Sequence, residues 1–158
     1  MTIAIGDRLP DATFNVLKDG VQAVNTQDVF GGRKVALFAV PGAFTPTCSA
    51  KHLPGYIEQL GAFQAKGIAV ACLSVNDAFV MGAWAKQAGV PDGIEMLADG
   101  NGAFAQALGL ELDASGFGMG KRSQRYSMLV KDGVVAELNV EQGGEFKVSA
   151  ADYLLGQI

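Results

Sequence analysis

The sequence contains few of the side chains that usually build metal or redox sites: its 158 residues include two cysteines and one histidine. Two cysteines cannot form a disulfide scaffold, and one histidine leaves no Cys/His cluster with metal-ligand spacing. We therefore expect neither a metal nor another cofactor. The net charge is −4 and no Lys/Arg cluster stands out, so a nucleic-acid partner is not expected. No apolar run approaches the ~20 residues of a membrane span, so a membrane partner is not expected either.

The N-terminus also lacks a basic segment followed by an apolar one, which is the pattern of a signal peptide. Without a secretion signal, the sequence predicts a reducing, cytoplasmic compartment, where a functional cysteine is a reactive thiol rather than half of a disulfide. The length suits one domain over residues 1–158, and the hydrophobic fraction of 49% is ample for a single core.

Hydrophobic patterns and turn signals predict an alternation of strands and helices. Strands are predicted at residues 34–40, 68–75, 94–97, 125–130 and 134–140. Helices are predicted at residues 47–65 (bent or interrupted by Pro54), 79–89 and 101–108, with a last helix opened by residues 149–152. Hairpin turns are predicted at residues 18–20 and 131–133, and a loop at residues 111–124. This order indicates an α/β fold with a mixed sheet flanked by helices.

Cys48 has the most informative surroundings in the chain. It follows the apolar run 35–40 and a short segment that contains two prolines and a glycine. Thr45 or Thr47 can cap the helix expected next, which would place Cys48 in its first turn. The positive end of the helix dipole and the unpaired N–H groups there favour a thiolate, which is the nucleophilic form of cysteine.

The spacing Pro41-x-x-x-Thr45-x-x-Cys48 resembles the active-site signature of the peroxiredoxins, thiol peroxidases with a thioredoxin-like fold. The wider string at residues 41–49 and the following Lys51-His52-Leu53-Pro54-Gly55 are similar to the type II, or peroxiredoxin-five, subfamily. Further matching segments lie at residues 6–10, 74–81 and 125–130. The resemblance spans nearly the whole chain. It implies reduction of hydrogen peroxide and small alkyl hydroperoxides through a sulfenic acid on Cys48.

The resemblance also implies roles for the residues around Cys48. Thr45 is expected to hold the thiolate and the peroxide, in addition to capping the helix. Pro41 is expected to shield the cysteine from water, and Gly42 to let the backbone approach the substrate closely. Arg125 is expected to stabilise charge on the thiolate and the reacting oxygens, because a guanidinium is a permanent cation.

Two of these assignments have competitors. Arg122 lies three residues before Arg125, and either could be an ordinary surface arginine; the strand Tyr-Ser-Met-Leu-Val that follows Arg125 selects it by resemblance. His52 follows Cys48 by four residues, so the two can share a helix face and His52 could act as a general base. We favour a supporting hydrogen bond for His52, since a thiolate already stabilised needs no base.

Cys72 lies inside the apolar run 68–73 and is interpreted as a buried, inert thiol. The alternative is a resolving cysteine that forms a disulfide with Cys48, with thioredoxin as reductant. Many members of the subfamily resolve the sulfenic acid with a cysteine near the C-terminus, and this chain has none after Cys72. That departure implies a one-cysteine mechanism recycled by an outside thiol such as glutathione with glutaredoxin.

The resemblance further implies a homodimer, with contacts from the loops that carry Phe44, Phe79 and Met81, although these residues suit a core equally well. A function of another class stays open: a redox sensor or holdase that uses oxidation of Cys48 as a switch. A disulfide reductase is disfavoured, because its Cys-x-x-Cys motif would need a cysteine where Thr45 stands.

Overall fold

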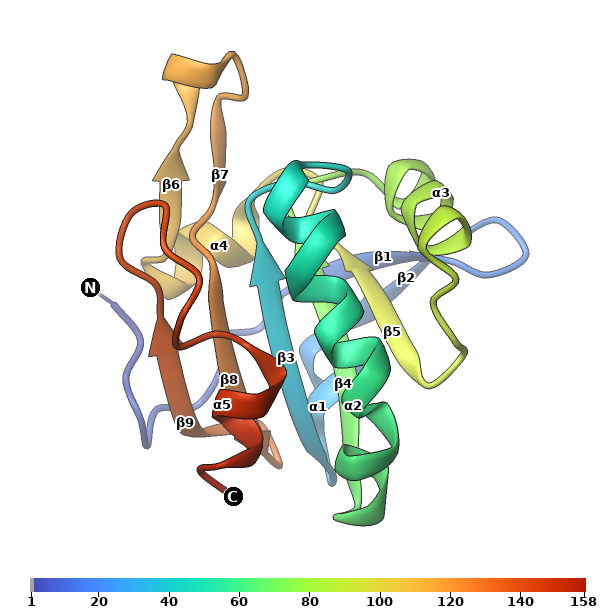
Figure 1. Ribbon diagram of the computed structural model, residues 1–158, viewed down its shortest axis with the longest axis vertical. Helices are drawn as coiled ribbons and strands as arrows, with labels where there is room; N and C mark the ends of the chain where they lie inside the picture. The colour runs from blue at the N-terminus through green and yellow to red at the C-terminus, as the bar shows by residue number, and fades with distance from the viewer. Residues whose placement is uncertain (1) are drawn as a thin grey trace.

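The computed structural model describes residues 2–158, which form a twisted sheet covered by helices (Figure 1). Within these residues the main sheet has seven strands in the order β2-β1-β5-β4-β3-β8-β9. Its strands are β1 (Thr13–Leu17), β2 (Val21–Asn25), β3 (Lys34–Val40), β4 (Ile68–Ser74), β5 (Ile94–Ala98), β8 (Tyr126–Lys131) and β9 (Val134–Val140). β3 pairs parallel with β4 and antiparallel with β8, so the predicted mixed sheet and thioredoxin-like α/β fold are confirmed.

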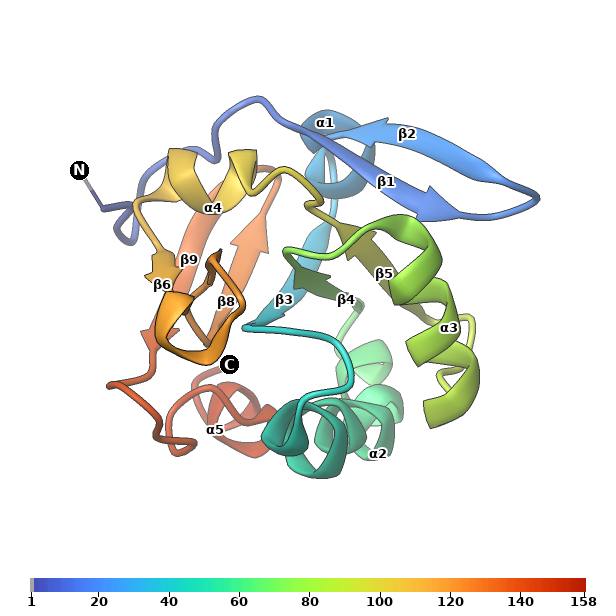
Figure 2. The same ribbon diagram turned by 90° about the horizontal axis from the view of Figure 1, so that it is seen from above.

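Helices cover both faces of the sheet (Figure 2). The helices are α1 (Thr26–Phe30), α2 (Leu53–Ala65), α3 (Ala78–Ala88), α4 (Ala103–Leu108) and α5 (Ala151–Leu155). α2 and α5 lie on one face, where Phe38 of β3 stacks on Tyr56 of α2 with ring centroids 4.0 Å apart. α1 and α4 lie on the other face, where their apolar side chains pack around Phe14. The short α1 was not expected from the sequence.

The central strands are the ones whose sequences are almost wholly apolar. Six of the seven residues of β3 and six of the seven of β4 are buried, since helices cover both of their faces. Both predicted hairpin turns are present, and each uses an Asp-Gly pair with positive φ: 51° and 96° at Asp19 and Gly20, and 47° and 79° at Asp132 and Gly133. Such turns match the twist of the strands that they join.

The helix predicted at residues 47–65 is present, but its first part is not α-helical. Helical structure begins at Pro46, continues as a π-helical turn over Cys48–His52, and becomes α2 at Leu53. The Leu53 N–H donates to the carbonyl oxygen of Cys48, five residues back. Pro54 explains the wider turn, because its ring would clash with the carbonyl four residues earlier in a regular α-helix.

The loop predicted at residues 111–124 is wrong at both of its ends. It contains a small hairpin of β6 (Glu111–Asp113) and β7 (Lys121–Ser123), joined through a 3-10 turn over Ser115–Phe117. Figure 1 shows this hairpin projecting beyond the edge of the main sheet. Strands of three residues are too short for an alternating pattern to be visible in the sequence.

The side-chain cap predicted for the helix that carries Cys48, from Thr45 or Thr47, is also wrong. Thr47 makes no capping hydrogen bond, and the Thr45 hydroxyl donates to the carbonyl oxygen of Gly42 at 2.7 Å. Pro46 is the first helical residue, a position that suits proline because the N–H it lacks would be unpaired there. At α5 the Ser149 hydroxyl donates to Glu141 instead of capping the helix.

Candidate active site

Cys48 sits where the carboxyl end of β3 passes through a tight loop into the helix (Figure 1). Thr45 N–H donates to the carbonyl oxygen of Gly42 at 3.3 Å, and this turn places Phe44 at φ 67°. Positive φ is unusual for a bulky residue and marks a conformation that the surrounding structure enforces. The turn delivers Cys48 to the first helical turn, as predicted, with its side chain fully buried.

A second loop supports the first. Asn76, just after β4, accepts hydrogen bonds through its side-chain oxygen from Ala43 N–H at 2.9 Å and from the Ser74 hydroxyl at 2.5 Å. Because β3 and β4 are parallel neighbours, the loops after them lie at the same edge of the sheet. Asn76 belongs to a segment that matches the family, but its tie to the cysteine loop was not predicted.

Arg125 reaches Cys48 across the sheet. It precedes β8, and the pairing of Tyr126 with Ala39 puts it beside the end of β3. Its Nη2 donates to the Cys48 sulfur at 3.1 Å. A fixed cation that donates to a buried sulfur favours the anionic thiolate, because little water is present to compete for either group.

His52 also contacts Arg125, and its tautomer follows from the partners. Arg125 Nη1 lies 2.8 Å from His52 Nδ1; a guanidinium only donates, so Nδ1 is the acceptor. The proton is then on Nε2, which donates to the carbonyl oxygen of Ser149 at 3.0 Å. Burial, and secondly the positive charge of Arg125, lower the pKa of His52 from 6.5 to about 3. This arrangement favours the supporting hydrogen bond over a general base.

The other predicted residues have different surroundings. The Arg122 guanidinium donates to the carbonyl oxygens of Met119 and Val75, so of the two arginines it is Arg125 that contacts the sulfur. A Cβ at Gly42 would meet Met119 at 3.1 Å and Arg122 at 3.3 Å, so the close approach at this glycine involves the β6–β7 hairpin. The shielding predicted for Pro41, which is half-buried, stays a prediction.

Cys72 lies within β4, opposite Phe38, and belongs to the same buried apolar cluster as Cys48. Both thiols are free. Burial, and secondly the charge of Cys48, raise the pKa of the Cys72 thiol well above its ordinary value. A protonated thiol is a poor nucleophile, which agrees with the interpretation of Cys72 as inert.

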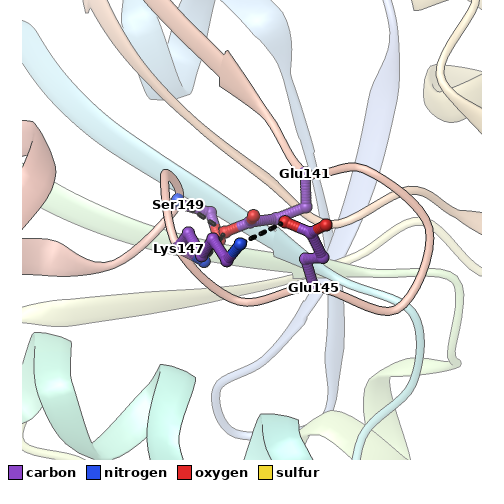
Figure 3. Close-up of polar contacts among 4 residues, drawn as sticks. All are labelled: Glu141, Glu145, Lys147 and Ser149. Carbon is purple, nitrogen blue, oxygen red and sulfur yellow. Dashed lines mark hydrogen bonds and ion pairs between the residues drawn. The ribbon is translucent and has the colours of Figure 1, made fainter.

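Sequence reasoning missed the segment after β9, which closes the site from one side. The centroid of the Phe146 ring lies 5.1 Å from the centroid of the His52 ring and 5.9 Å from the Arg125 guanidinium carbon. Glu141 accepts hydrogen bonds from Lys147 and Ser149. Figure 3 shows these residues together with Glu145, which pairs with Lys147. Glu141 is followed by Gln142 and two glycines, and this context carries no signal that separates it from a surface residue.

The fold and the site together define a class of protein. A thioredoxin-like sheet that presents a buried cysteine at a helix start, with a guanidinium donating to its sulfur, is typical of thiol-dependent redox proteins. A bilayer-spanning helix, long and apolar enough to cross, is not found in residues 2–158.

Similarity to known proteins identifies the family. The family model described as Redoxin matches residues 4–155. Peroxiredoxin-2E-2, chloroplastic, of Oryza sativa subsp. japonica is 53% identical over 98% of this chain and 72% of its own length. Peroxiredoxin-2B of Arabidopsis thaliana is 47% identical over 97% of this chain and 96% of its own length. The crystal structure of reduced Prx3 in complex with H2O2 from Vibrio vulnificus has a TM-score of 0.94 and 50% identity, covering 99% of this chain and 96% of that one.

The chain belongs to the peroxiredoxins, and within them to type II. It is a thiol-dependent peroxidase, whose substrate is a peroxide and whose reductant is a thiol. The family, fold and enzyme class predicted from the sequence are confirmed.

Proposed function

We propose that Cys48 is the residue oxidised by peroxide and that Arg125 stabilises its thiolate. The observation that carries this assignment is the hydrogen bond of 3.1 Å from Arg125 Nη2 to the Cys48 sulfur. The likeness to a Prx3 crystallised with H2O2 supports hydrogen peroxide as one substrate. Thr45, Pro41 and Gly42 form the loop that would contact the peroxide. Because Cys48 is fully buried, this loop must move slightly outward before a peroxide can touch the sulfur.

In the proposed reaction the thiolate sulfur attacks one peroxide oxygen, so that an S–O bond forms while the O–O bond breaks. The departing hydroxide or alkoxide takes up a proton and leaves as water or alcohol. Cys48 is oxidised by two electrons to a sulfenic acid, and the peroxide is reduced by two electrons. The guanidinium of Arg125 stabilises the negative charge that moves from sulfur to the departing oxygen.

The proposed route back uses an outside thiol. A glutathione thiol attacks the sulfenic sulfur, forms a mixed disulfide and releases water; a second thiol, from glutaredoxin or glutathione, then frees Cys48. The buried, protonated Cys72 supports this one-cysteine route. Its place in the same apolar cluster as Cys48 favours a second candidate, in which Cys72 resolves the sulfenic acid and thioredoxin reduces the disulfide.

Steady-state peroxide consumption with each electron donor tests both routes. We expect turnover with glutathione and glutaredoxin, none in the Cys48→Ser variant, and nearly full activity in the Cys72→Ser variant. After stoichiometric peroxide, the intact mass should rise by one oxygen, or by one glutathione when that thiol is present. A loss of two hydrogens that Cys72→Ser abolishes, together with turnover on thioredoxin alone, would establish the second candidate.

Two further proposals concern the setting of the enzyme. A homodimer is supported by the exposed rings of Phe44 and Phe79 near the site, whereas Met81 is buried and belongs to the core.

The cytoplasmic compartment stays a proposal from the sequence. Similar relatives differ on this point, because the name of the Oryza sativa protein includes chloroplastic and that of Peroxiredoxin-2B does not.

A further inference from the structure

Glu141 is a buried carboxylate whose partners all come from one short segment. It has 8% of its surface exposed and directly follows β9. A single carboxylate oxygen, Oε2, accepts from Lys147 N–H at 2.8 Å, from Ser149 N–H at 2.8 Å and from the Ser149 hydroxyl at 2.6 Å (Figure 3). A buried carboxylate is retained only where such donors replace its lost water. The three bonds therefore hold residues 147–149 tightly against the end of β9.

The segment that Glu141 holds supplies the carbonyl group that orients His52. The Ser149 carbonyl oxygen accepts from His52 Nε2 at 3.0 Å and from the Tyr56 hydroxyl at 3.1 Å. While this acceptor stays in place, the His52 proton remains on Nε2 and Nδ1 remains free to accept from Arg125. The other tautomer would point an N–H at the guanidinium, which can only donate.

A backbone hydrogen bond links Glu141 directly to Arg125, which closes the series of hydrogen bonds that runs through Ser149 and His52. Glu141 N–H donates to the backbone carbonyl oxygen of Arg125 at 2.9 Å. Glu141 thus contacts Arg125 through its main chain, and its side chain is linked to the Arg125 guanidinium through Ser149 and His52. Each hydrogen bond in this closed series has a donor–acceptor distance of 3.0 Å or less. This series of hydrogen bonds starts and ends on Arg125, which donates to the Cys48 sulfur.

We propose that Glu141 is a positioning residue for catalysis: by holding Ser149 it fixes the tautomer of His52, and so the aim of the Arg125 guanidinium at Cys48. Glu141 itself touches neither the sulfur nor the peroxide. The proposal rests on the assignment of Cys48 and Arg125 as the reacting pair.

Glu141→Gln is the sharpest variant, because it keeps the shape of the side chain and removes its charge. We expect the second-order rate constant for oxidation of Cys48 by hydrogen peroxide to fall about tenfold, as one charged hydrogen-bond network is weakened. The acid limb of the pH–rate profile should also move to higher pH, because a less well aimed guanidinium stabilises the thiolate less. Glu145→Gln is the matched control: Glu145 lies in the same loop, is more exposed, and pairs with Lys147 at 3.2 Å. Its rate and profile should match the wild type.

A double-mutant cycle separates positioning from general stabilisation. In an Arg125→Ala background, Glu141→Gln should lower the rate no further, since the group it aims is absent. An unchanged rate and pH profile in folded Glu141→Gln would overturn the proposal, and so would an equal loss in both backgrounds. If Glu141→Gln does not fold, the test uses Ser149→Ala, which removes only the hydroxyl donor. We expect a smaller loss of rate with the same direction of shift in the pH–rate profile. An unchanged rate and profile in this variant would refute the proposal.

An error in the cysteine assignment and an error in the positioning role would give different results. Peroxide consumption by the Cys48→Ser chain would refute the assignment of the reacting cysteine. A normal Glu141→Gln chain beside an inactive Cys48→Ser chain would refute only the positioning role.

Discussion

At the scale of single residues, two arginines three positions apart have different tasks. Arg122 donates to the Met119 and Val75 carbonyl oxygens, which ties the β6–β7 hairpin to the loop after β4. Arg125 donates to the Cys48 sulfur and to His52 Nδ1 through its two terminal nitrogens. The fork geometry of the guanidinium matters at Arg125, because one nitrogen meets each partner.

Arg125→Lys should therefore remain strongly impaired although it keeps the positive charge. An ammonium is a point donor and cannot reach both partners in the same geometry. We expect kcat/KM for hydrogen peroxide to fall on the order of 10²-fold, the scale of removing one charge-stabilising donor. The same assay on Arg122→Lys provides the control, which should lose less than tenfold. A larger loss at Arg122 than at Arg125 would reverse the assignment.

His52 makes the stability of the fold depend on pH. Its pKa is lowered to about 3 by burial and by Arg125, so the folded chain keeps it neutral while the unfolded chain protonates it below pH 6.5. The unfolded state then binds more protons, and the free energy of unfolding falls as the pH drops. Most carboxylates stay ionised down to about pH 5, which leaves a window where this single histidine dominates.

Urea unfolding of the Cys48→Ser chain at several pH values tests this dependence without the titratable thiol at the site. Between pH 6.5 and about 5 the free energy of unfolding should fall by roughly 1.5 kcal/mol. Adding His52→Gln should remove most of that slope. A slope that persists in the double variant would show that another group is responsible.

At the scale of elements, the site depends on loops that leave neighbouring parallel strands. β3 leads into the cysteine loop and β4 into the loop of Asn76, whose side chain accepts from Ala43 N–H at 2.9 Å. The positive φ of Phe44 lies within the first loop and needs such support from its surroundings.

Asn76→Ala should loosen this edge of the sheet. It leaves the Ala43 N–H and the Ser74 hydroxyl without their partner, which costs about 1–3 kcal/mol for each buried group left unpaired. We expect a lower urea midpoint with an unchanged slope, and a slower reaction with peroxide. Asn101→Ala, at an exposed position, is the control and should match the wild type. Equal midpoints for the two variants would show that the tie contributes nothing.

At the scale of the whole molecule, exposed aromatic rings are unevenly distributed. Phe44 and Phe79 have 45% and 66% of their surface exposed, and both belong to loops or helix starts near the cysteine. Phe117 is 85% exposed in the turn of the β6–β7 hairpin, and Tyr153 is 46% exposed on α5. Exposed rings beside a site are typical of an interaction surface.

If the proposed homodimer forms through the first pair, Phe79→Ser should shift the sedimentation equilibrium towards monomer at least tenfold, as loss of a buried aromatic contact usually does. Phe117→Ser removes an equally apolar ring elsewhere and should leave the equilibrium unchanged. Sedimentation at several concentrations measures both. A shift in Phe117→Ser alone would place the interface at the hairpin.

Much of this protein could be predicted from short stretches of sequence. The buried strand at 34–40, the loop breakers and the start of the helix lie within thirty consecutive positions, and together they place Cys48 in the first helical turn. Both Asp-Gly turns were predictable for the same reason. Helix propensity, turn chemistry and hydrophobic period act between neighbours along the chain. The family resemblance then selected Arg125.

The details that depend on pairing across the sheet were decided only by the tertiary structure. Arg125 and Cys48 are 77 positions apart, and His52 and Ser149 are 97 apart. No pattern within either segment specifies the other, because the register of β8 against β3 and the fold of residues 141–149 bring them together. The cap expected from Thr45 or Thr47 is absent, and the Thr45 hydroxyl has its partner outside the helix. Local chemistry determined where the cysteine lies, and long-range packing determined which charged groups surround it.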